Sequence, residues 1–136
     1  MSVVIDASAA ACWIFRDEAT LATDALLARV RNTGGHVPAL WNWEMANLLI
    51  AGIRRARINI ADATGHLADL ALLPIAIDAE APERAWREAF FLAQAHNLTA
   101  YDAAYLELAQ RTGFELASKD AALCAAATAL GVKLAL

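Results

Sequence analysis

The sequence predicts an α/β fold with three layers, α/β/α, in which a sheet of short parallel strands is flanked by helices. Apolar runs of three to five residues alternate with much longer amphipathic stretches, which is typical of parallel sheets covered on both faces. Hydrophobic residues make up 60% of the chain and charged residues 19%, a composition that excludes disorder. With 136 residues and no apparent linker or repeat, the chain is expected to form a single domain, residues 1–136.

The first half of the chain begins with a buried strand at residues 2–6. A brief extended segment, His36-Val37-Pro38, is expected after Gly34-Gly35, which ends the preceding helix. Asn59 is a plausible N-cap, and Pro74 ends the helix that Asn59 begins. The helices of this half are expected at residues 8–15, 20–32, 40–56 and 59–73.

The second half continues the alternation of strands and helices. Ile75–Asp78 is expected to be a strand, and Pro82 suits the first position of the next helix. Thr99 can cap the following helix, with Asp102 three residues later in the capping-box position. Helices are expected at residues 82–96, 99–113 and 120–131, and strands at 114–118 and 132–134.

The composition limits the class of protein and its compartment. No uncharged apolar stretch reaches the roughly 18 residues that span a bilayer, and the beginning of the chain does not resemble a signal peptide. We therefore expect a cytoplasmic protein without membrane contact. Cys12 and Cys124 lack zinc-binding or disulfide spacing and are expected to be buried thiols. The net charge of −4 argues only mildly against nucleic-acid binding.

Four acidic residues occupy positions where an acid is locally unfavourable: Asp6, Glu44, Asp102 and Asp120. Asp6 ends an apolar strand, and Asp120 follows another one. Glu44 and Asp102 lie within the apolar stripes of two helices. Carboxylates are rarely buried unless they are paired or bind a metal, and ligands of parallel sheets collect where the strands end. The pattern therefore predicts an acidic cluster that binds a divalent cation.

Simpler explanations exist for most of these acids when each is taken singly. An acid in the first turn of a helix is more often a capping group, which could account for Asp102 or Asp120. An acid that ends a strand, such as Asp6, is more often a turn residue or an N-cap. Glu44 has no comparable local role. Carboxylate oxygens suit Mg²⁺ or Mn²⁺, which can activate water for attack on a phosphoryl group.

Four segments resemble the motifs of PIN-domain ribonucleases of the VapC toxin type, found in prokaryotic toxin–antitoxin operons. Val3–Ala9 resembles the first motif, an apolar strand that ends in Asp and is followed by Ser. Trp43–Leu49 resembles the acidic helix motif usually written E-V-A-N-x-L, and residues 98–109 give the longest match. Residues 116–123 resemble the last motif, although Ser118 stands where Thr is common and Lys119 separates it from Asp120.

This resemblance spans residues 3–134 and implies a PIN-like fold and a metal-dependent endoribonuclease. It implies Asp6 and Asp102 as core ligands of Mg²⁺ or Mn²⁺. Glu44 and Asp120 would complete the metal pocket, directly or through water, and Ser118, with Ser8, would support it. No organic cofactor is expected. The implied partners are an RNA substrate and a cognate antitoxin that covers the pocket of a homodimer, which gives a heterotetramer or a larger complex.

Several questions remain open at the level of sequence. Arg54, Arg55 and Arg57 either contact RNA phosphates or cap a helix C-terminus, and Lys119 is a further candidate phosphate contact. Most of the apolar residues in the group Trp13, Phe15, Trp41, Trp43 and Ile50 are expected in the core, the rest at an interface. Two alternatives to the nuclease are a phosphoacceptor signalling domain of flavodoxin-like fold and a catalytically silent RNA- or protein-binding module.

Overall fold

The structure, a computed structural model, describes residues 2–136 and is built around a parallel four-stranded sheet. The strands β1 (Val3–Ile5), β2 (Gly35–Pro38), β3 (Ile75–Asp78) and β4 (Glu115–Ala117) lie in the order β3-β2-β1-β4. β1 is central, and Ile5 pairs with Ala117 of β4 at the ends of both strands. The predicted three-layer α/β/α class is confirmed.

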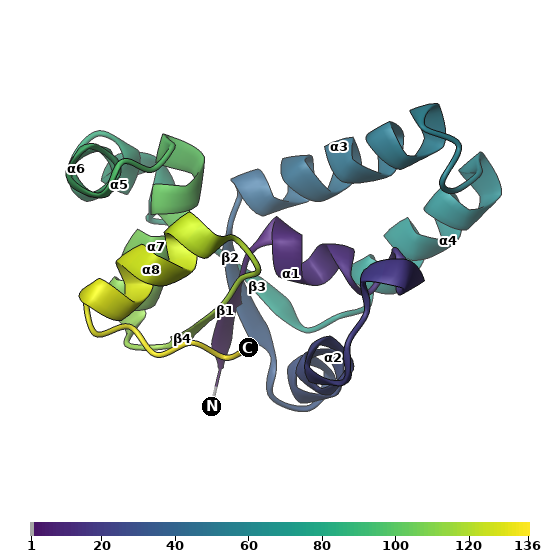
Figure 1. The fold of residues 1–136 in the computed structure, drawn as a ribbon, viewed down its shortest axis with the longest axis horizontal. Coiled ribbons are helices and arrows are strands. Elements are labelled where there is room, and N and C mark those ends of the chain that lie inside the picture. The colour runs from purple at the N-terminus through teal and green to yellow at the C-terminus, as the bar shows by residue number, and fades with distance from the viewer. Residues whose placement is uncertain (1) are drawn as a thin grey trace.

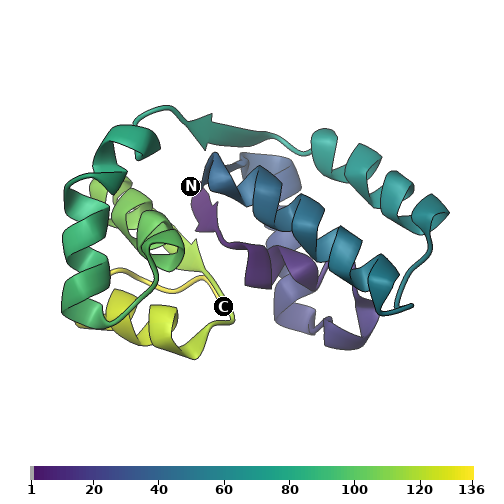
Figure 2. The ribbon, with the colours of Figure 1, turned by 90° about the horizontal axis from the view of Figure 1, so that it is seen from above.

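Two groups of helices cover the two faces of this sheet. Figure 2 shows α1 to α4 on one side, in purple to blue-green, and α5 to α8 on the other, in green to yellow. Figure 1 gives the labels of these elements. The helices are α1 (Ala7–Ala11), α2 (Leu21–Thr33), α3 (Leu40–Arg54), α4 (Ile60–Ala71), α5 (Ala81–Ala85), α6 (Glu88–His96), α7 (Ala100–Thr112) and α8 (Ala121–Ala129), with a 3-10 turn at Arg16–Glu18.

Local capping signals place most helix ends where the sequence predicts them. Asn59 caps α4 in a reciprocal capping box with Asp62, and Thr99 accepts a hydrogen bond from the Asp102 N–H at the start of α7. Gly113 ends α7 in the left-handed region with φ of 74°, where a residue without a Cβ is favoured. Asp120 caps α8 through the Leu123 N–H.

Three predicted elements differ from the structure. The helix expected at residues 82–96 is two helices, because the backbone at Arg87 (φ −132°, ψ −97°) leaves the helical region. This break allows both α5 and α6 to pack against α7. The strand expected at 132–134 is a single bridge between Leu134 and Leu116. The helix expected at 8–15 ends at Ala11, and turns continue the chain from there.

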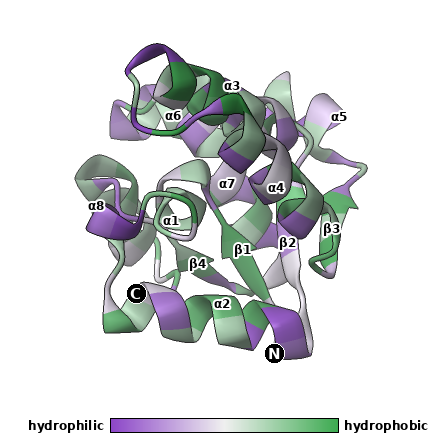
Figure 3. Ribbon diagram, turned by 90° about the vertical axis from the view of Figure 1, so that its right-hand side faces the viewer, coloured by the Kyte–Doolittle hydropathy of each residue, from purple (hydrophilic) through white to green (hydrophobic). Residues whose placement is uncertain are grey.

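The hydrophobic core lies on both faces of the central strand, which Figure 3 shows in green at the centre of the molecule. Val3, Val4 and Ile5 are fully buried, because β1 has a strand on each side and helices above and below it. Among the five apolar residues singled out in the sequence, Trp13, Phe15 and Trp41 are in the core, whereas Trp43 and Ile50 are exposed. Both cysteines are free; Cys12 is buried and Cys124 is half-buried.

A largely buried arginine on α7 ties the end of β3 to the helical layer. The Arg111 guanidinium donates to both Asp78 oxygens, at 2.6 and 3.2 Å. It also donates to Glu107 one turn earlier, at 2.9 Å, and to Glu80 beside α5, at 2.8 Å. Burial alone would raise the pKa of Asp78, but the hydrogen bonds and charge of Arg111 outweigh it and hold that pKa below its usual value.

None of the helices within residues 2–136 has both the length and the apolar character that crossing a bilayer requires.

Candidate active site

The site is built around two side chains that the sheet register brings together. Asp6 directly follows β1, and Ser118 directly follows β4. Because Ile5 and Ala117 are paired at the strand ends, the Asp6 N–H donates to the Ala117 carbonyl at 3.1 Å. The Ser118 hydroxyl in turn donates to Asp6 Oδ2 at 2.5 Å, over a sequence separation of 112 residues. Sheet order and register therefore bring these two strand ends together.

Both oxygens of the Asp6 carboxylate accept hydrogen bonds from the protein. Oδ1 accepts from the Ala9 N–H at 2.9 Å, which makes Asp6 the N-cap of α1, and from the Ser8 hydroxyl at 2.7 Å. The side chain of Asp6 is only 4% exposed. Burial raises the pKa of Asp6, the bonds from Ser118, Ala9 and Ser8 lower it in part, and the nearby charge of Asp120 raises it.

The segment from Ser118 to Asp120 is fixed by two further hydrogen bonds. The Ser118 hydroxyl accepts from the Asp120 N–H at 3.0 Å, and the Ser8 hydroxyl accepts from the Lys119 N–H at 2.8 Å. Asp120 uses one carboxylate oxygen, Oδ1, to cap α8. The simpler explanation of Asp6 and Asp120 as N-caps is therefore correct as a local statement. It does not explain why the two caps lie at neighbouring strand ends.

Glu44 and Tyr105 connect the two helical layers at this site. Glu44 lies on α3, and its Oε1 accepts a hydrogen bond from the Tyr105 hydroxyl of α7 at 2.5 Å. Tyr105 is only 1% exposed, and burial followed by the Glu44 carboxylate raises the pKa of its hydroxyl far above the usual value. Tyr105 lies within the matching segment 98–109, but the sequence does not single it out as a site residue. Its position one turn after Asp102, on the same face of α7, was the available signal.

The four acids influence one another through their charges. Burial raises the pKa of Asp102, and the charges of Asp120 and Asp6 raise it further. Burial also raises the pKa of Glu44; its bond from Tyr105 lowers that pKa in part, and the charges of Asp102 and Asp6 raise it. The structure therefore places Asp6, Glu44, Asp102 and Asp120 within electrostatic reach of one another.

Within the part of the chain that the structure describes, no cationic side chain pairs with this group. Among the ion pairs within residues 2–136, none involves any of the four acids. In the same part of the chain, no three Asp, Glu, His or Cys side chains lie close enough together to form a metal cluster by themselves. The site is thus an uncompensated set of carboxylates around a tightly hydrogen-bonded Asp6.

The four basic residues considered in the sequence as possible phosphate contacts have different surroundings. Arg57 forms ion pairs with Asp17 at 2.8 Å and Glu18 at 3.1 Å, so it has a structural role. Arg55 and Lys119 line a cavity beside Asp6, and Arg54 does not line it.

Replacing Tyr105 with Phe tests the hydrogen bond from Tyr105 of α7 to Glu44 of α3. The variant keeps the buried ring but leaves the half-buried Glu44 carboxylate without its donor. We expect the free energy of unfolding to fall by about 1.5–3 kcal/mol, the range for hydrogen bonds to charged groups, as measured by urea denaturation. The exposed Tyr101 offers a matched control, since Tyr101→Phe should leave stability unchanged. Equal stability of the two variants would contradict the role given to Tyr105.

Comparison with known proteins assigns the chain and its fold to a family. The PIN domain family model matches residues 3–129. The chain is 30% identical to Ribonuclease VapC3 of Pyrobaculum aerophilum over 120 residues, which cover 88% of this chain and 90% of that protein. The crystal structure of PAE2754 from Pyrobaculum aerophilum is similar in fold, with a TM-score of 0.69 and 24% identity over 93% of this chain and 84% of that one.

The chain belongs to the PIN-domain family and, within it, to the VapC-type ribonucleases. The predicted family is confirmed, and the alternative of a flavodoxin-like phosphoacceptor domain is set aside.

Proposed function

We propose that this protein is a metal-dependent endoribonuclease that acts as the toxin of a type II toxin–antitoxin pair in the cytoplasm. The observation that carries the proposal is the buried Asp6 carboxylate, held by Ser118 and surrounded by three acids without a cation partner. Partly buried acids whose pKa values are raised by burial and by neighbouring carboxylates, as for Asp6, Glu44 and Asp102, are costly to maintain for stability alone. The comparison with known proteins supports the same proposal, since one relative of this chain is named a ribonuclease.

The donor set fits a small hard cation. All four candidate ligands are carboxylates, which Mg²⁺ and Mn²⁺ prefer. The pKa values of Asp6, Glu44 and Asp102 are raised first by burial and then by neighbouring carboxylates, whose charge a cation would offset. Because no three of these side chains form a cluster, we propose that one or two carboxylates, with Asp6 and Asp102 first, hold the ion together with water. Magnesium sites of that kind are common.

Each residue of the site then has a separate proposed role in the reaction. A bound cation would polarise the phosphoryl oxygen and lower the pKa of a coordinated water. Glu44 or Asp120, each with a free carboxylate oxygen, would orient a water and take its proton. Ser118 and Ser8 would hold Asp6 in one orientation. In-line attack by water on phosphorus breaks the bond to the 3′ oxygen, so the products carry a 5′-phosphate and a 3′-hydroxyl.

Exposed apolar side chains support the partners proposed from the family resemblance. Trp86, Phe90 and Phe91 are exposed on and beside α6, and Trp43 and Ile50 are exposed on α3. Clustered exposed apolar residues often mark interaction surfaces. We propose a homodimer that binds a cognate antitoxin, in a heterotetramer or a larger complex, with the antitoxin covering the acidic site.

Replacing Asp6 with Asn tests the function directly. Asn keeps the shape of the side chain but removes the charge, so we expect a loss of about 10³-fold or more in RNA cleavage with Mn²⁺, equivalent to several kcal/mol of transition-state stabilisation. Growth arrest on expression should disappear as well. Asp24→Asn removes an exposed acid paired with Arg16 and should behave as the wild type. Equal cleavage by the wild type and Asp6→Asn would refute the proposal, and failure of a folded wild type to cut any RNA would favour a silent binding module.

A further inference from the structure

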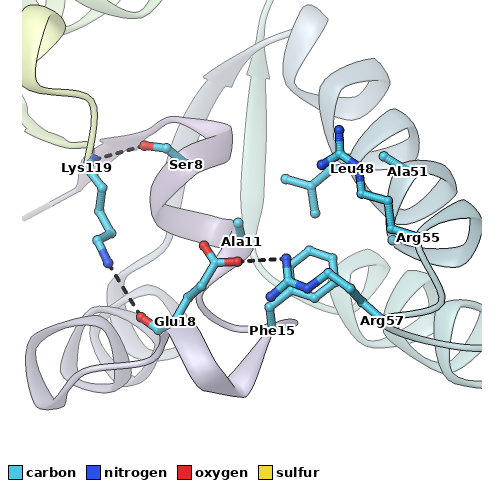
Figure 4. Close-up of a pocket in the computed structure, with 10 residues that line it drawn as sticks. Ser8, Ala11, Phe15, Glu18, Leu48, Ala51, Arg55, Arg57 and Lys119 are labelled. Atoms are coloured by element: carbon cyan, nitrogen blue, oxygen red, sulfur yellow. Dashed lines mark hydrogen bonds and ion pairs between the residues drawn. The ribbon is translucent and has the colours of Figure 1, made fainter.

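A second concave feature lies next to the acidic site. It is a cavity of about 330 Å³ between α1 with the segment that follows it and the C-terminal half of α3. Figure 4 shows Lys119 and Arg55 on opposite sides of it, with Phe15 between them. Leu48 and Ala51 of α3 also line it. Its size is within the range of sites that bind small organic groups.

The cavity and the acidic site share residues, so that they form one continuous surface. Ser8 and Lys119 both line the cavity. The Ser8 hydroxyl also donates to Asp6 Oδ1 and accepts from the Lys119 N–H. A chain whose reacting phosphate lies at Asp6 can therefore place its next unit in the cavity without a change of the fold.

The charges around the cavity favour an anionic occupant. The charge of Arg57 is already paired with Asp17 and Glu18. Its guanidinium carbon lies 3.9 Å from the centroid of the Phe15 ring. These pairs also neutralise Glu18, the one acid that lines the cavity. Within residues 2–136, the Arg55 guanidinium makes no hydrogen bond or ion pair. Lys119 Nζ makes a long contact of 3.5 Å to the Glu18 carbonyl and interacts with the Cys12 thiol, but it forms no ion pair among the same residues. Two cations thus remain available.

The cavity has little with which to read the edge of a base. Among residues 2–136, its lining contains no amide side chain, and the one hydroxyl in it, that of Ser8, is occupied by Asp6 and Lys119. Apolar surface from Leu48 and Ala51 can instead cover the face of an unstacked base, which is tolerant of sequence because every base has such a face. An unstacked base requires a single-stranded nucleic acid.

We propose that this cavity binds the nucleotide next to the cleaved bond of a single-stranded RNA, with Arg55 and Lys119 contacting its phosphates. The proposal rests on the ribonuclease function above. Arg55 is then a substrate-binding residue, Arg57 a structural one that fixes Phe15 and Glu18, and Arg54 is outside the contact.

The test compares two neighbouring arginines at the C-terminal end of α3, Arg54 and its C-cap Arg55. Binding of a fluorescein-labelled single-stranded RNA is measured by anisotropy in the Asp102→Asn background, and cleavage kinetics are measured with Asp102 intact. Arg55→Ala should raise Kd by about five- to tenfold and reduce the salt dependence by about one phosphate contact. It should raise KM and leave kcat nearly unchanged. Arg54→Ala, with the same loss of charge, should change each value by less than about twofold.

A second variant fills the cavity without changing charge. Ala51→Phe should weaken binding of the same RNA, with folding checked by its melting temperature. Equal effects of Arg55→Ala and Arg54→Ala would overturn the proposal while leaving the nuclease intact. The proposal would also fail if Arg55→Ala left RNA binding unchanged but abolished inhibition by the antitoxin, which would assign the cavity to a protein partner. If the folded wild type cut no RNA, the proposed function itself would fail, which is a separate outcome.

Discussion

Replacing Asp102 with Asn is expected to make the metal-free protein more stable while removing its ribonuclease activity. Burial and the charges of Asp120 and Asp6 raise the pKa of Asp102, so that its ionised form is less favourable in the folded chain than in the unfolded one. Asn keeps the backbone N–H that donates to Thr99. At pH 7.5 we expect a higher melting temperature than that of the wild type, by a few degrees at most, because solvent screens part of the repulsion at this partly exposed carboxylate.

The pH dependence of this difference has a definite sign. A raised folded-state pKa means that the stability of the wild type falls as the pH rises through that pKa. The advantage of Asp102→Asn should therefore be present at neutral pH and shrink as the pH falls toward 3.8, the ordinary value for Asp. Melting curves across this range, measured in a chelator, test this. A wild type more stable than Asp102→Asn at neutral pH would contradict it.

Cations should reverse the order of the two proteins. Anything that binds the folded state alone stabilises it by RT ln(1 + [L]/Kd), so Mn²⁺ should raise the melting temperature of the wild type. The same Mn²⁺ should have little effect on Asp102→Asn, whose RNA cleavage should fall by about 10³-fold. Asp69→Asn, which removes an exposed acid on α4, should leave both the cleavage and the response to Mn²⁺ unchanged.

The second large effect is expected at Arg111. Arg111→Met keeps much of the packing of the side chain but leaves the carboxylates of Glu107 and Asp78 without their donor. Glu107 is only 4% exposed. Breaking a buried pair from one side costs about 3–5 kcal/mol, because the remaining charge is uncompensated. We expect a loss of that size in the free energy of unfolding, measured by urea denaturation.

A double variant distinguishes the effect of an unpaired buried charge on stability from the effect of lost packing. Adding Glu107→Gln to Arg111→Met removes one of the stranded charges, and it should recover part of the lost stability. No recovery would mean that packing, and not charge, dominates. Arg16→Met breaks only an exposed pair with Asp24 and should leave the free energy of unfolding nearly unchanged, because solvent screens exposed pairs.

Much of the fold could be predicted because its signals are local. The parallel strands are short apolar runs, and the caps at Asn59, Thr99 and Asp120 depend on residues within three or four positions of one another. The break at Arg87 could not be predicted, because no Gly or Pro marks it and its cause is the packing of α5 and α6 on α7. The single bridge at Leu134 likewise depends on how far the last segment runs alongside β4.

Some features of the candidate site could likewise be predicted from the sequence, and others could not. Asp6, Glu44, Asp102 and Asp120 stand out in the sequence because each conflicts with its apolar surroundings. The hydrogen bond from Tyr105 to Glu44 cannot be recognised in the sequence, since it depends on the rotation of α3 relative to α7. The different surroundings of Arg55 and Arg57 also require tertiary structure, because the two residues are equivalent in a pattern of charges.

The bond between Ser118 and Asp6 has a consequence for the order of events during synthesis. Asp6 is made early, but the hydroxyl that fixes it comes 112 residues later, and β4 must first dock beside β1. A ribosome-bound fragment that stops short of residue 118 therefore lacks the completed pocket. Any activity that depends on this pocket cannot appear while the first three strands are emerging. We therefore expect the proposed ribonuclease to stay inactive until almost the whole of this sequence has been translated and folded.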